Sequence, residues 1–403
     1  MKVCVIGAGI VGCSTAYQLA RMGCEVHLVD EAAGAGLLTS FANGAQLSYS
    51  YVEPLASPHT LFSLPGLLLA RHSPLRFTPK LDWRQWYWGL QFLGACTTNQ
   101  VENGTRKLLQ LSQLSRDTLA QWMDSESWSF DHKVNGKLVL CPNKDSLKRQ
   151  ERQIQFQRHL GCQQEILSAD ECVVKEPALQ KYSGKFAGGV WTADERVADP
   201  YKLCMELVKS SQRLGATVSF NTPIDDFVTS ADRLTHVRTS KGELMADAYV
   251  LATGASAAVH AAKLGIHLPV YPIKGYSITV PIGDATCAPQ ISVTELSMKT
   301  VFAPLGQSLR VAAMAEIGGH DLAISEGRIQ QMLASVESVF PGLCDVESLN
   351  PWAGLRPATP TSIPIVGRSK YKNLFLNVGH GALGLTLAAG SAVALSQELM
   401  HPR

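Results

Sequence analysis

Three glycines near the start of the chain have the spacing that holds a dinucleotide. Gly7, Gly9 and Gly12 stand in the order G-x-G-x-x-G within the segment GAGIVG. The first glycine of this pattern allows a tight turn, the second lets the backbone approach a pyrophosphate, and the third lets a helix pack closely on a strand. Asp30 follows Gly12 by 18 positions, where a carboxylate can accept both ribose hydroxyls. The pattern predicts a dinucleotide site; the alternative is a glycine turn without a ligand.

A strand, a helix and a second strand must position these residues. The apolar run at residues 3–6 predicts a buried parallel strand. A helix should follow and end near Gly23, with Ala16, Leu19 and Ala20 on one face and free N–H groups directed at the phosphates. The second strand is predicted over residues 25–29, directly before Asp30.

A second glycine turn, near the end of the chain, favours FAD over a nicotinamide cofactor. Residues 374–389 indicate a strand, a turn at Gly379-His380-Gly381 and an apolar helix. The N-terminus of such a helix can stabilise the negative charge that develops at the O2/N1 edge of a flavin on reduction. A further apolar strand at residues 248–252 ends in Thr253-Gly254, at the strand end where such sheets bind ligands.

The middle of the chain predicts a second domain. A length of 403 residues exceeds what one hydrophobic core usually supports. Residues 60–195 contain aromatic-rich helices, short strands and a charged helix at 145–159, which we interpret as a solvated face. Residues 265–344 are rich in strands, and their alternation predicts an antiparallel sheet with one covered face.

Composition excludes several functional classes. The net charge of +2 comes without a long basic run, so no nucleic-acid partner is expected. Ten cysteines are scattered without metal-ligand spacing, which is typical of reduced thiols in the cytoplasm and predicts no metal site. The N-terminal apolar stretch is interpreted as fold and not as a signal peptide, and no segment offers the ~20 uninterrupted apolar residues of a spanning helix. The segment Leu61–Ala70 contains Pro65 and is interpreted as a buried loop or short helix, with a membrane-touching loop as the alternative.

Several motifs, taken in order, resemble one family over nearly the whole chain. They are GAGIVG with Asp30, TSFANGAQLS at 39–48, ATGA at 252–255, YPIKGYSITVP at 271–281, MAEIGG at 314–319, GLRPATPTSIPIVG at 354–367 and NVGHGALGLTLAAGS at 377–391. This set resembles the bacterial D-amino acid dehydrogenase small subunit family. That family belongs to the wider D-amino acid oxidase, glycine oxidase and sarcosine oxidase group.

The resemblance implies a fold, a reaction and partners. The fold class is α/β combined with α+β: a glutathione-reductase-like Rossmann domain for FAD and a substrate domain with a mixed, antiparallel sheet. We expect residues 1–60, 196–262 and 345–403 in the FAD domain, and residues 61–195 and 263–344 in the substrate domain. The implied reaction is oxidative deamination of D-amino acids to 2-oxo acids and ammonia, with electrons passed to a quinone-type acceptor. We expect a cytoplasmic location and keep peripheral association with the inner membrane open.

The resemblance also carries the candidate site. Arg356 in G-L-R-P is the candidate anchor for the substrate carboxylate, since its planar fork matches a carboxylate, and an interdomain salt bridge is the alternative. Tyr51, Tyr271 and Tyr276 could share the carboxylate or cap the site, or could be packed aromatics, and Lys274 is left off the site. His380 could donate to the flavin or cap its turn. The residues expected to contact a non-covalently bound FAD are Gly7, Ala8, Gly9, Ile10, Val11, Gly12, Asp30, Glu31, Thr39, Ser40, Asn43, Gly44, Gln46, Pro223, Ile224, Thr253, Gly254, Gly354, Arg356, Gly379, His380, Gly381, Leu383, Gly384, Leu385 and Thr386.

Two departures from the family and two other functions stay open. The family usually has N-A-G where this chain has Asn43-Gly44-Ala45, and its members carry a tail beyond the point where this chain reaches residues 401–403. Oxidation of a secondary amine such as glycine, sarcosine, proline or hydroxyproline fits the same motifs. So does a non-catalytic flavin subunit of a larger complex.

Overall fold

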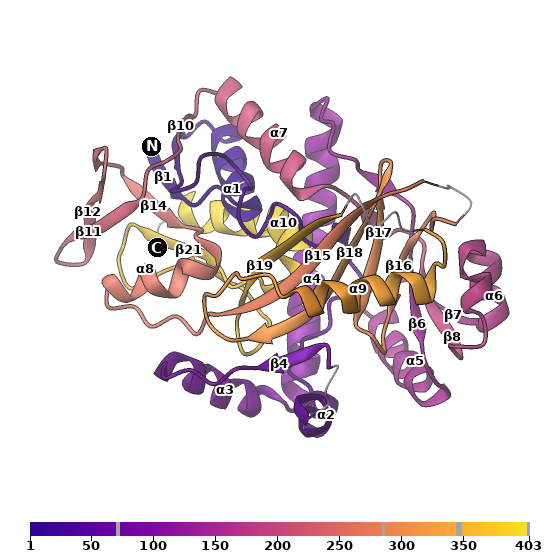
Figure 1. Ribbon diagram of the computed structural model, residues 1–403. Helices are drawn as coiled ribbons and strands as arrows, with labels where there is room; N and C mark the ends of the chain where they lie inside the picture. The colour runs from indigo at the N-terminus through magenta and orange to yellow at the C-terminus, as the bar shows by residue number, and fades with distance from the viewer. Residues whose placement is uncertain (70–72, 284–286, 344–348, 401–403) are drawn as a thin grey trace.

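A six-stranded sheet holds the N-terminal and C-terminal parts of the chain together (Figure 1). The computed structural model describes residues 1–69, 73–283, 287–343 and 349–400. The strand order is β10-β2-β1-β14-β21-β20, parallel except for the edge strand β20. The strands are β1 (Lys2–Ile6), β2 (Glu25–Val29), β10 (Thr217–Ser219), β14 (Ala248–Leu251), β20 (Ile365–Arg368) and β21 (Leu374–Val378). The predicted dinucleotide unit and the predicted strand before Thr253 therefore lie in one sheet.

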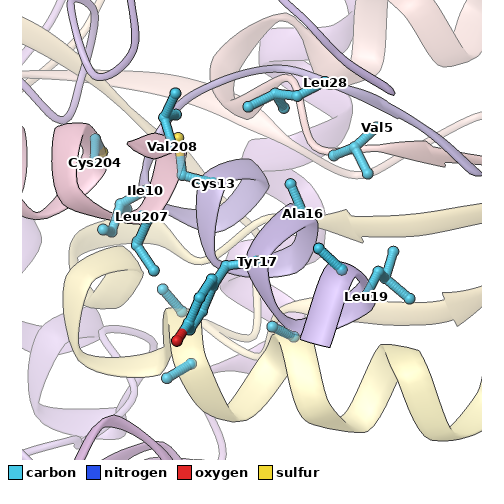
Figure 2. Packing of buried hydrophobic residues seen from close by; sticks show 14 of the residues in the cluster. Val5, Ile10, Cys13, Ala16, Tyr17, Leu19, Leu28, Cys204, Leu207 and Val208 are labelled. Atoms are coloured by element: carbon cyan, nitrogen blue, oxygen red, sulfur yellow. The ribbon is translucent and has the colours of Figure 1, made fainter. Parts of the chain in front are cut away.

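Alternation along β1 gives this sheet two buried faces. Val3 and Val5 pack into a core with α1 (Ile10–Arg21), α7 (Pro200–Arg213) and α10 (Gly384–Met400), part of which is shown in Figure 2. Cys4 and Ile6 point to the other face, where they pack with α8 (Ala257–Lys263) and a small antiparallel sheet. That sheet has the order β11-β12-β13, with bounds Ile224–Ser230, Arg233–Thr239 and Gly242–Leu244.

The helix α10 is a core helix. By length and composition, residues 381–400 could cross a membrane, which the sequence pattern did not predict, and 61% of that window is buried. The helix packs against α1 and against the long helix α4 (Thr98–Ser125). We therefore assign its apolar residues to the protein core.

The second part of the molecule is a nine-stranded mixed sheet. Its order is β19-β15-β18-β17-β16-β6-β8-β7, and β4 adds to β18. The bounds are β4 (Leu75–Phe77), β6 (Lys137–Cys141), β7 (Glu165–Ser168), β8 (Gly188–Thr192), β15 (Tyr271–Pro281), β16 (Ser292–Glu295), β17 (Thr300–Leu305), β18 (Ser308–Ile317) and β19 (Asn350–Ala358). The predicted antiparallel stretch forms its centre, and the two predicted short strands are β6 and β8.

The two faces of this sheet meet different surroundings. Ile278 packs in the core under α9 (Glu326–Val339), with Met332 and Val336. Ser277 points the other way, and its hydroxyl donates to the carbonyl oxygen of Ala42 at 2.5 Å. The loop at residues 39–48 thus lies on the face opposite α9.

The remaining elements include α5 (Lys144–Arg158) and α6 (Ala169–Lys175), which pack on the large sheet at β6 and β8. The others are α2 (Pro58–Leu69), α3 (Trp83–Ala95), the 3₁₀ turns at Pro177–Tyr182, Gly254–Ser256 and Gly381–Leu383, and the small sheet β3 (Gln46–Leu47), β9 (Arg196–Val197) and β5 (Lys133–Val134). Leu61–Leu69 lies within the helix α2, which includes Pro65. Ala70 is the last residue of the segment that we interpreted as a buried loop or short helix, and it lies outside the described residues. Residues 344–348 and 401–403 also lie outside them.

The division of the chain into domains stays a prediction. The pairing of β19 with β15 concerns one of its predicted boundaries. The strand β19 pairs with β15 in the large sheet, whereas β20 and β21 belong to the parallel sheet. Residues 350–358, which we expected in the FAD domain, are therefore part of the large sheet.

The crossing of α10 and α4 depends on Gly390. A Cβ atom there would lie 2.5 Å from the carbonyl oxygen of Leu111 and 2.8 Å from the amide nitrogen of Ser115. We expect Gly390→Ala to lower the free energy of unfolding by roughly 1–3 kcal/mol, because backbone atoms must move apart. Gly89→Ala in α3 is the matched control, since no atom lies within 4 Å of its added Cβ. Urea denaturation measures both, and equal stabilities would contradict this packing.

Candidate active site

The glycine-rich turn contains two glycines that the fold itself requires and one that it does not. Gly7 has φ +109°, and a Cβ there would lie 2.5 Å from the carbonyl oxygen of Ala252. A Cβ on Gly12 would overlap the carbonyl oxygen of Gly7. A Cβ on Gly9, by contrast, would meet only the Ser40 hydroxyl at 3.5 Å. The protein's own packing does not explain Gly9, whereas a pyrophosphate before the helix would.

The acid at the end of β2 is fixed beside this turn. The Asp30 carboxylate accepts hydrogen bonds from the amides of Ala8 at 2.5 Å and Ala32 at 2.7 Å. The backbone amide of Thr222 donates to the carbonyl oxygen of Asp30 at 2.9 Å, which brings Pro223 and Ile224 to the same end of the sheet. Glu31 is exposed next to this group. The sequence-predicted ribose residues therefore lie together.

The loop at residues 39–48 connects the two sheets. Ser40 accepts a hydrogen bond from the amide of Ile10, the first residue of α1, at 3.0 Å. On the other side, the Thr39 hydroxyl donates to the carbonyl oxygen of Leu355 at 2.8 Å, and Arg310 donates to that of Asn43 at 3.0 Å. Thr39, Ser40 and Asn43 thus hold the helix that starts at the glycine turn against the strands β18 and β19.

The departure from the family's N-A-G leaves a strained alanine. Ala45, which stands where the family has its glycine, has φ +55°, the left-handed conformation that glycine adopts at little cost. Gly44 does not have a positive φ, and a Cβ there would be 3.5 Å from the Ala312 side chain, an ordinary contact. In this chain the left-handed position of the turn is therefore occupied by Ala45, and the glycine lies one residue earlier, at Gly44.

The second glycine turn brings its residues to the start of α10. Gly379 and Gly381 have φ +82° and +55°, and the backbone of His380 bridges to Ala358 of β19. The His380 ring is buried, its Nε2 has no partner within the described residues, and burial lowers its pKa to about 3. It is therefore a neutral imidazole, and its side chain makes no capping hydrogen bond to the turn.

The other predicted residues lie in the first turns of α10 or in the turn that follows β14. Thr386 accepts a hydrogen bond from the amide of Ser48 at 3.2 Å. The Thr253 hydroxyl is buried without a partner in the described part of the chain, and Gly254 has φ +53° with no atom near its missing Cβ. Leu383, Gly384 and Leu385 lie in the first turns beside Thr386. Because β14 and β21 are parallel neighbours, the turns that follow them lie at the same edge of the sheet, one before α8 and the other before α10.

Arg356 is a partly buried cation, and no carboxylate partner of it is found in the described part of the chain. It donates to the carbonyl oxygen of Met314 at 2.8 Å, and burial lowers its pKa to about 10. Its guanidinium group occupies the space above Gly275, where any Cβ would overlap it. Among the described residues no acidic group lies within salt-bridge distance of Arg356. The interdomain salt bridge considered as its alternative role is therefore not formed in this part of the chain.

A bulge in β18 aims the Met314 carbonyl at Arg356. The register between β15 and β18 shifts between Lys274 and Tyr276, and Met314 has φ +67°. A left-handed methionine costs about 1–2 kcal/mol, so its surroundings must hold it. Gly275 pairs with Gly354, and side chains fill the space over both glycines: the Arg356 guanidinium lies over Gly275 and the Trp352 ring lies over Gly354.

The candidate tyrosines lie at different places on the large sheet. Tyr271 lies two residues before Ile273, the partner of Arg356, so the strand alternation puts it on the same face. Its hydroxyl is buried without a described partner, and burial raises its pKa to about 12. Tyr51 lies at the other end of the sheet, with its ring 4.5 Å from the Lys137 ammonium.

Tyr276 and Lys274 belong to the opposite face. The Tyr276 hydroxyl donates to Glu316 at 3.0 Å. Lys274 forms ion pairs with Glu316 at 3.3 Å and with Asp321 at 3.1 Å. Arg328 completes the network at 2.9 Å from Glu316. Tyr276 therefore does not share a face with Arg356, and Lys274 serves this network.

Sequence reasoning missed a second buried cation at the loop. The Lys137 ammonium donates to the side-chain oxygens of Gln46 and Ser48, each at 2.9 Å, and burial lowers its pKa. The Gln46 amide donates in turn to Ser292, so its side chain is already used by the protein. The Glu195 carboxylate accepts from the amides of Tyr49 and Ser50 at 2.6 and 2.8 Å, and burial raises its pKa. A lysine opening the otherwise apolar run KLVLC was the signal available in the sequence.

Comparison with known proteins decides the family. Residues 2–398 match the family described as "DAO: FAD dependent oxidoreductase". The chain belongs to this family. It is similar to D-amino acid dehydrogenase 2 of Ralstonia nicotianae, with 43% identity covering 98% of this chain and 96% of the relative. D-amino acid dehydrogenase of Granulibacter bethesdensis is 36% identical, covering 100% and 96%.

Solved structures show the same fold. Glycine oxidase from Geobacillus kaustophilus superposes with a TM-score of 0.77 at 20% identity, covering 98% of this chain and 94% of that one. L-proline dehydrogenase from P. horikoshii superposes with a TM-score of 0.79 at 17% identity, covering 99% and 93%. The predicted fold class, a Rossmann-type FAD domain with a mixed-sheet domain, is confirmed. The enzyme is an FAD-dependent oxidoreductase.

The residues present fit FAD. The space before Gly9 suits the pyrophosphate, and Asp30 is fixed where the ribose would lie. The buried, unpartnered hydroxyl of Thr253 and the neutral ring of His380 lie at the ends of β14 and β21. The contacts of individual residues with the cofactor stay predictions.

Gly9 gives a test of the phosphate site. We expect Gly9→Val to be folded but colourless, because its side chain would take the space in front of α1 while touching little of the protein. Gly12→Val should instead destabilise the apoprotein, because its Cβ overlaps a backbone carbonyl. The ratio of flavin to protein absorbance and the melting temperature of the apoprotein separate the two. A yellow Gly9→Val protein with full occupancy would place the phosphates elsewhere.

The strained alanine gives a second test. Exchanging the two residues, as Gly44→Ala with Ala45→Gly, should raise the free energy of unfolding by about 1 kcal/mol, since the left-handed position regains a glycine. Thermal unfolding of the holoenzyme measures this, and Gly44→Ala alone is the control for the added methyl group. A loss of stability in the exchanged variant would show that the turn at residue 45 is not left-handed.

Proposed function

We propose that the enzyme oxidises D-amino acids to 2-oxo acids and ammonia. The observation that carries the proposal is Arg356, a partly buried cation without a carboxylate partner in the described residues, whose guanidinium group lies over Gly275 while the Trp352 ring lies over the paired Gly354. Relatives at 36–43% identity over nearly their full length bear the name D-amino acid dehydrogenase, which supports the same substrate class. FAD, when bound, accepts the hydride from the substrate Cα.

The chain's own residues would hold and orient the substrate. A guanidinium group pairs with a carboxylate through two parallel hydrogen bonds, which fixes the amino acid in one orientation. The carbonyl of Met314 holds one side of the guanidinium, so its remaining N–H groups can face the substrate. Tyr271, on the same face, is the candidate to line the site, while Tyr51 lies further away beside Lys137.

No protein base is needed to balance the reaction. An amine that binds neutral supports hydride departure with its lone pair, and the resulting imino acid takes up water to give the 2-oxo acid and ammonia. The two electrons leave to an acceptor, which we propose to be a quinone. A quinone dissolved in the bilayer implies peripheral association with the membrane, on the cytoplasmic side.

Arg356 tests the substrate anchor. Loss of a buried, charge-assisted pair costs on the order of 3 kcal/mol, so Arg356→Ala should raise the KM for D-alanine more than a hundredfold while the flavin spectrum stays normal. Arg356→Lys should recover only part of the loss, because an ammonium cannot form both bonds.

The control is the substrate. An amine that lacks the carboxylate should be a poor substrate of the unaltered enzyme and should be little affected by the substitution. An unchanged KM together with lower thermal stability would make Arg356 a structural residue. The carboxylate anchor would then be sought at Arg310.

A further inference from the structure

The helix α3 is apolar on both its faces. Its inner face carries Trp88, Phe92 and Ala95, which are buried against β15 and β19. Its outer face carries Trp83, Trp86, Tyr87, Leu90 and Leu93, all exposed, with Leu90 at 69% and Trp83 at 59%. A helix that covers a sheet normally turns polar residues to water on its outer side. The outer face of α3 has the composition of a surface that is covered in use.

The exposed apolar surface continues beyond α3. Leu81, directly before the helix, is fully exposed, and Phe62 on α2 is 84% exposed. Leu64 of α2 packs against the same cluster as Trp88 and Phe92, so the two helices share one underlying core. Figure 1 shows α2 and α3 together at one edge of the molecule, beyond β4. We call the exposed residues Phe62, Leu81, Trp83, Trp86, Tyr87, Leu90 and Leu93 the α3 surface.

The segment of the chain that carries this surface has more basic than acidic residues. Between residues 54 and 95 the chain has four basic residues, Arg71, Arg76, Lys80 and Arg84, and one acidic residue, Asp82. Arg76, Lys80 and Arg84 are exposed. Asp82 caps α3 by accepting from the amide of Arg84 at 3.0 Å, and its carboxylate also lies 3.6 Å from the Arg84 guanidinium, so Arg76 and Lys80 carry the excess positive charge. The whole chain carries a net charge of only +2, so this segment is locally cationic.

We propose that the α3 surface docks on an anionic lipid bilayer, with α3 lying in the plane of the interface. Tryptophan and tyrosine prefer the interfacial zone of a bilayer, where the ring is partly buried and its polar atom meets the headgroups. Leucine and phenylalanine side chains enter the acyl boundary, and nearby lysine and arginine pair with anionic headgroups. Tryptophan, leucine and phenylalanine side chains with lysine and arginine beside them are the combination found in helices that lie in the interface of an anionic bilayer.

The inner face of α3 connects this surface to the candidate site. The Trp88 indole donates to the carbonyl oxygen of Ala358 at 2.8 Å, two residues beyond Arg356 on β19. Docking would therefore bring the strand that carries Arg356 close to the bilayer. The link to a quinone dissolved there rests on the proposed function, whereas the docking itself does not.

Vesicle binding of the holoenzyme tests the proposal. Flotation with phosphatidylglycerol vesicles and with phosphatidylcholine vesicles gives the partition coefficient for an anionic and a neutral surface. We expect binding to phosphatidylglycerol that weakens with salt, and much weaker binding to phosphatidylcholine. The double variant Tyr87→Gln with Leu90→Gln should bind at least about tenfold more weakly, because two of its inserted side chains become polar while glutamine still favours a helix.

A matched variant on a distant helix controls for the loss of exposed apolar area. Val174→Ser on α6 removes an apolar side chain that is 82% exposed, more than Tyr87 or Leu90, away from α3, and this variant should bind as the unaltered enzyme does. Equal vesicle binding by the double variant would overturn the proposal. The proposal would also be overturned if the holoenzyme bound neither kind of vesicle and formed a dimer that the double variant does not form. The α3 surface would then be a protein interface. Bleaching of the flavin by D-alanine in solution is measured in parallel; its absence in a protein that binds vesicles would refute the proposed function and leave the docking intact.

Discussion

Hydrogen bonds from the loop at residues 39–48 hold the two sheets of this enzyme against each other. This loop follows the dinucleotide unit in the chain. Its Ser40 hydroxyl accepts a hydrogen bond from the amide of Ile10, the first residue of α1. Its residues Thr39, Ala42 and Asn43 form hydrogen bonds with strands of the large sheet. The loop carries its own backbone constraint at Ala45 and is held at its far end by Lys137 and Glu195. Because the phosphates are expected at one end of this loop and the flavin along it, a small change in the loop would move the cofactor relative to Arg356.

The large sheet collects positive charge on the face that this loop covers. The strand registers place Arg356, Arg310 and Lys137 on that face, and none of the three has a carboxylate within 4.0 Å among the described residues. Burying a cation without compensation is costly, so such groups are kept where an anion binds or where carbonyl oxygens replace it. Arg310 and Lys137 are satisfied by oxygen atoms of the loop. Arg356 keeps donors free, which agrees with a cofactor carrying two phosphates and a substrate carrying a carboxylate.

Local patterns in the sequence predicted much of this architecture. The dinucleotide unit, the strand before Thr253 and the helix after Gly381 follow from glycine chemistry and apolar periodicity within short segments, and the structure has each of them. The pairing of β19 with β15 could not be predicted in this way, because it joins segments some eighty residues apart by contacts that neither segment encodes alone. The separation of Tyr276 from Tyr271 likewise depends on strand parity, which a pattern of aromatic residues does not fix.

The candidate site likewise combines features that a short segment of sequence predicts with features that depend on contacts between distant segments. Arg356 was predictable because a carboxylate needs a fork-shaped cation, and its motif is local. Its support is not local: the Met314 bulge is on β18 and Gly275, over which the guanidinium group lies, is on β15. Lys137 was missed because its role depends on the path of the loop over β6. The apolar outer face of α3 can be recognised only once it is known which residues of the helix face the protein core.

The central claim is that this enzyme takes a hydride from D-amino acids, and anaerobic titration of the flavin absorbance tests it most directly. D-alanine, its L enantiomer, L-proline and sarcosine are added separately to the oxidised holoenzyme under nitrogen. Rapid and complete bleaching by D-alanine, with slow or no bleaching by the other three, is the predicted result. Bleaching by L-proline or sarcosine but not by D-alanine would contradict the claim and assign the site to secondary amines.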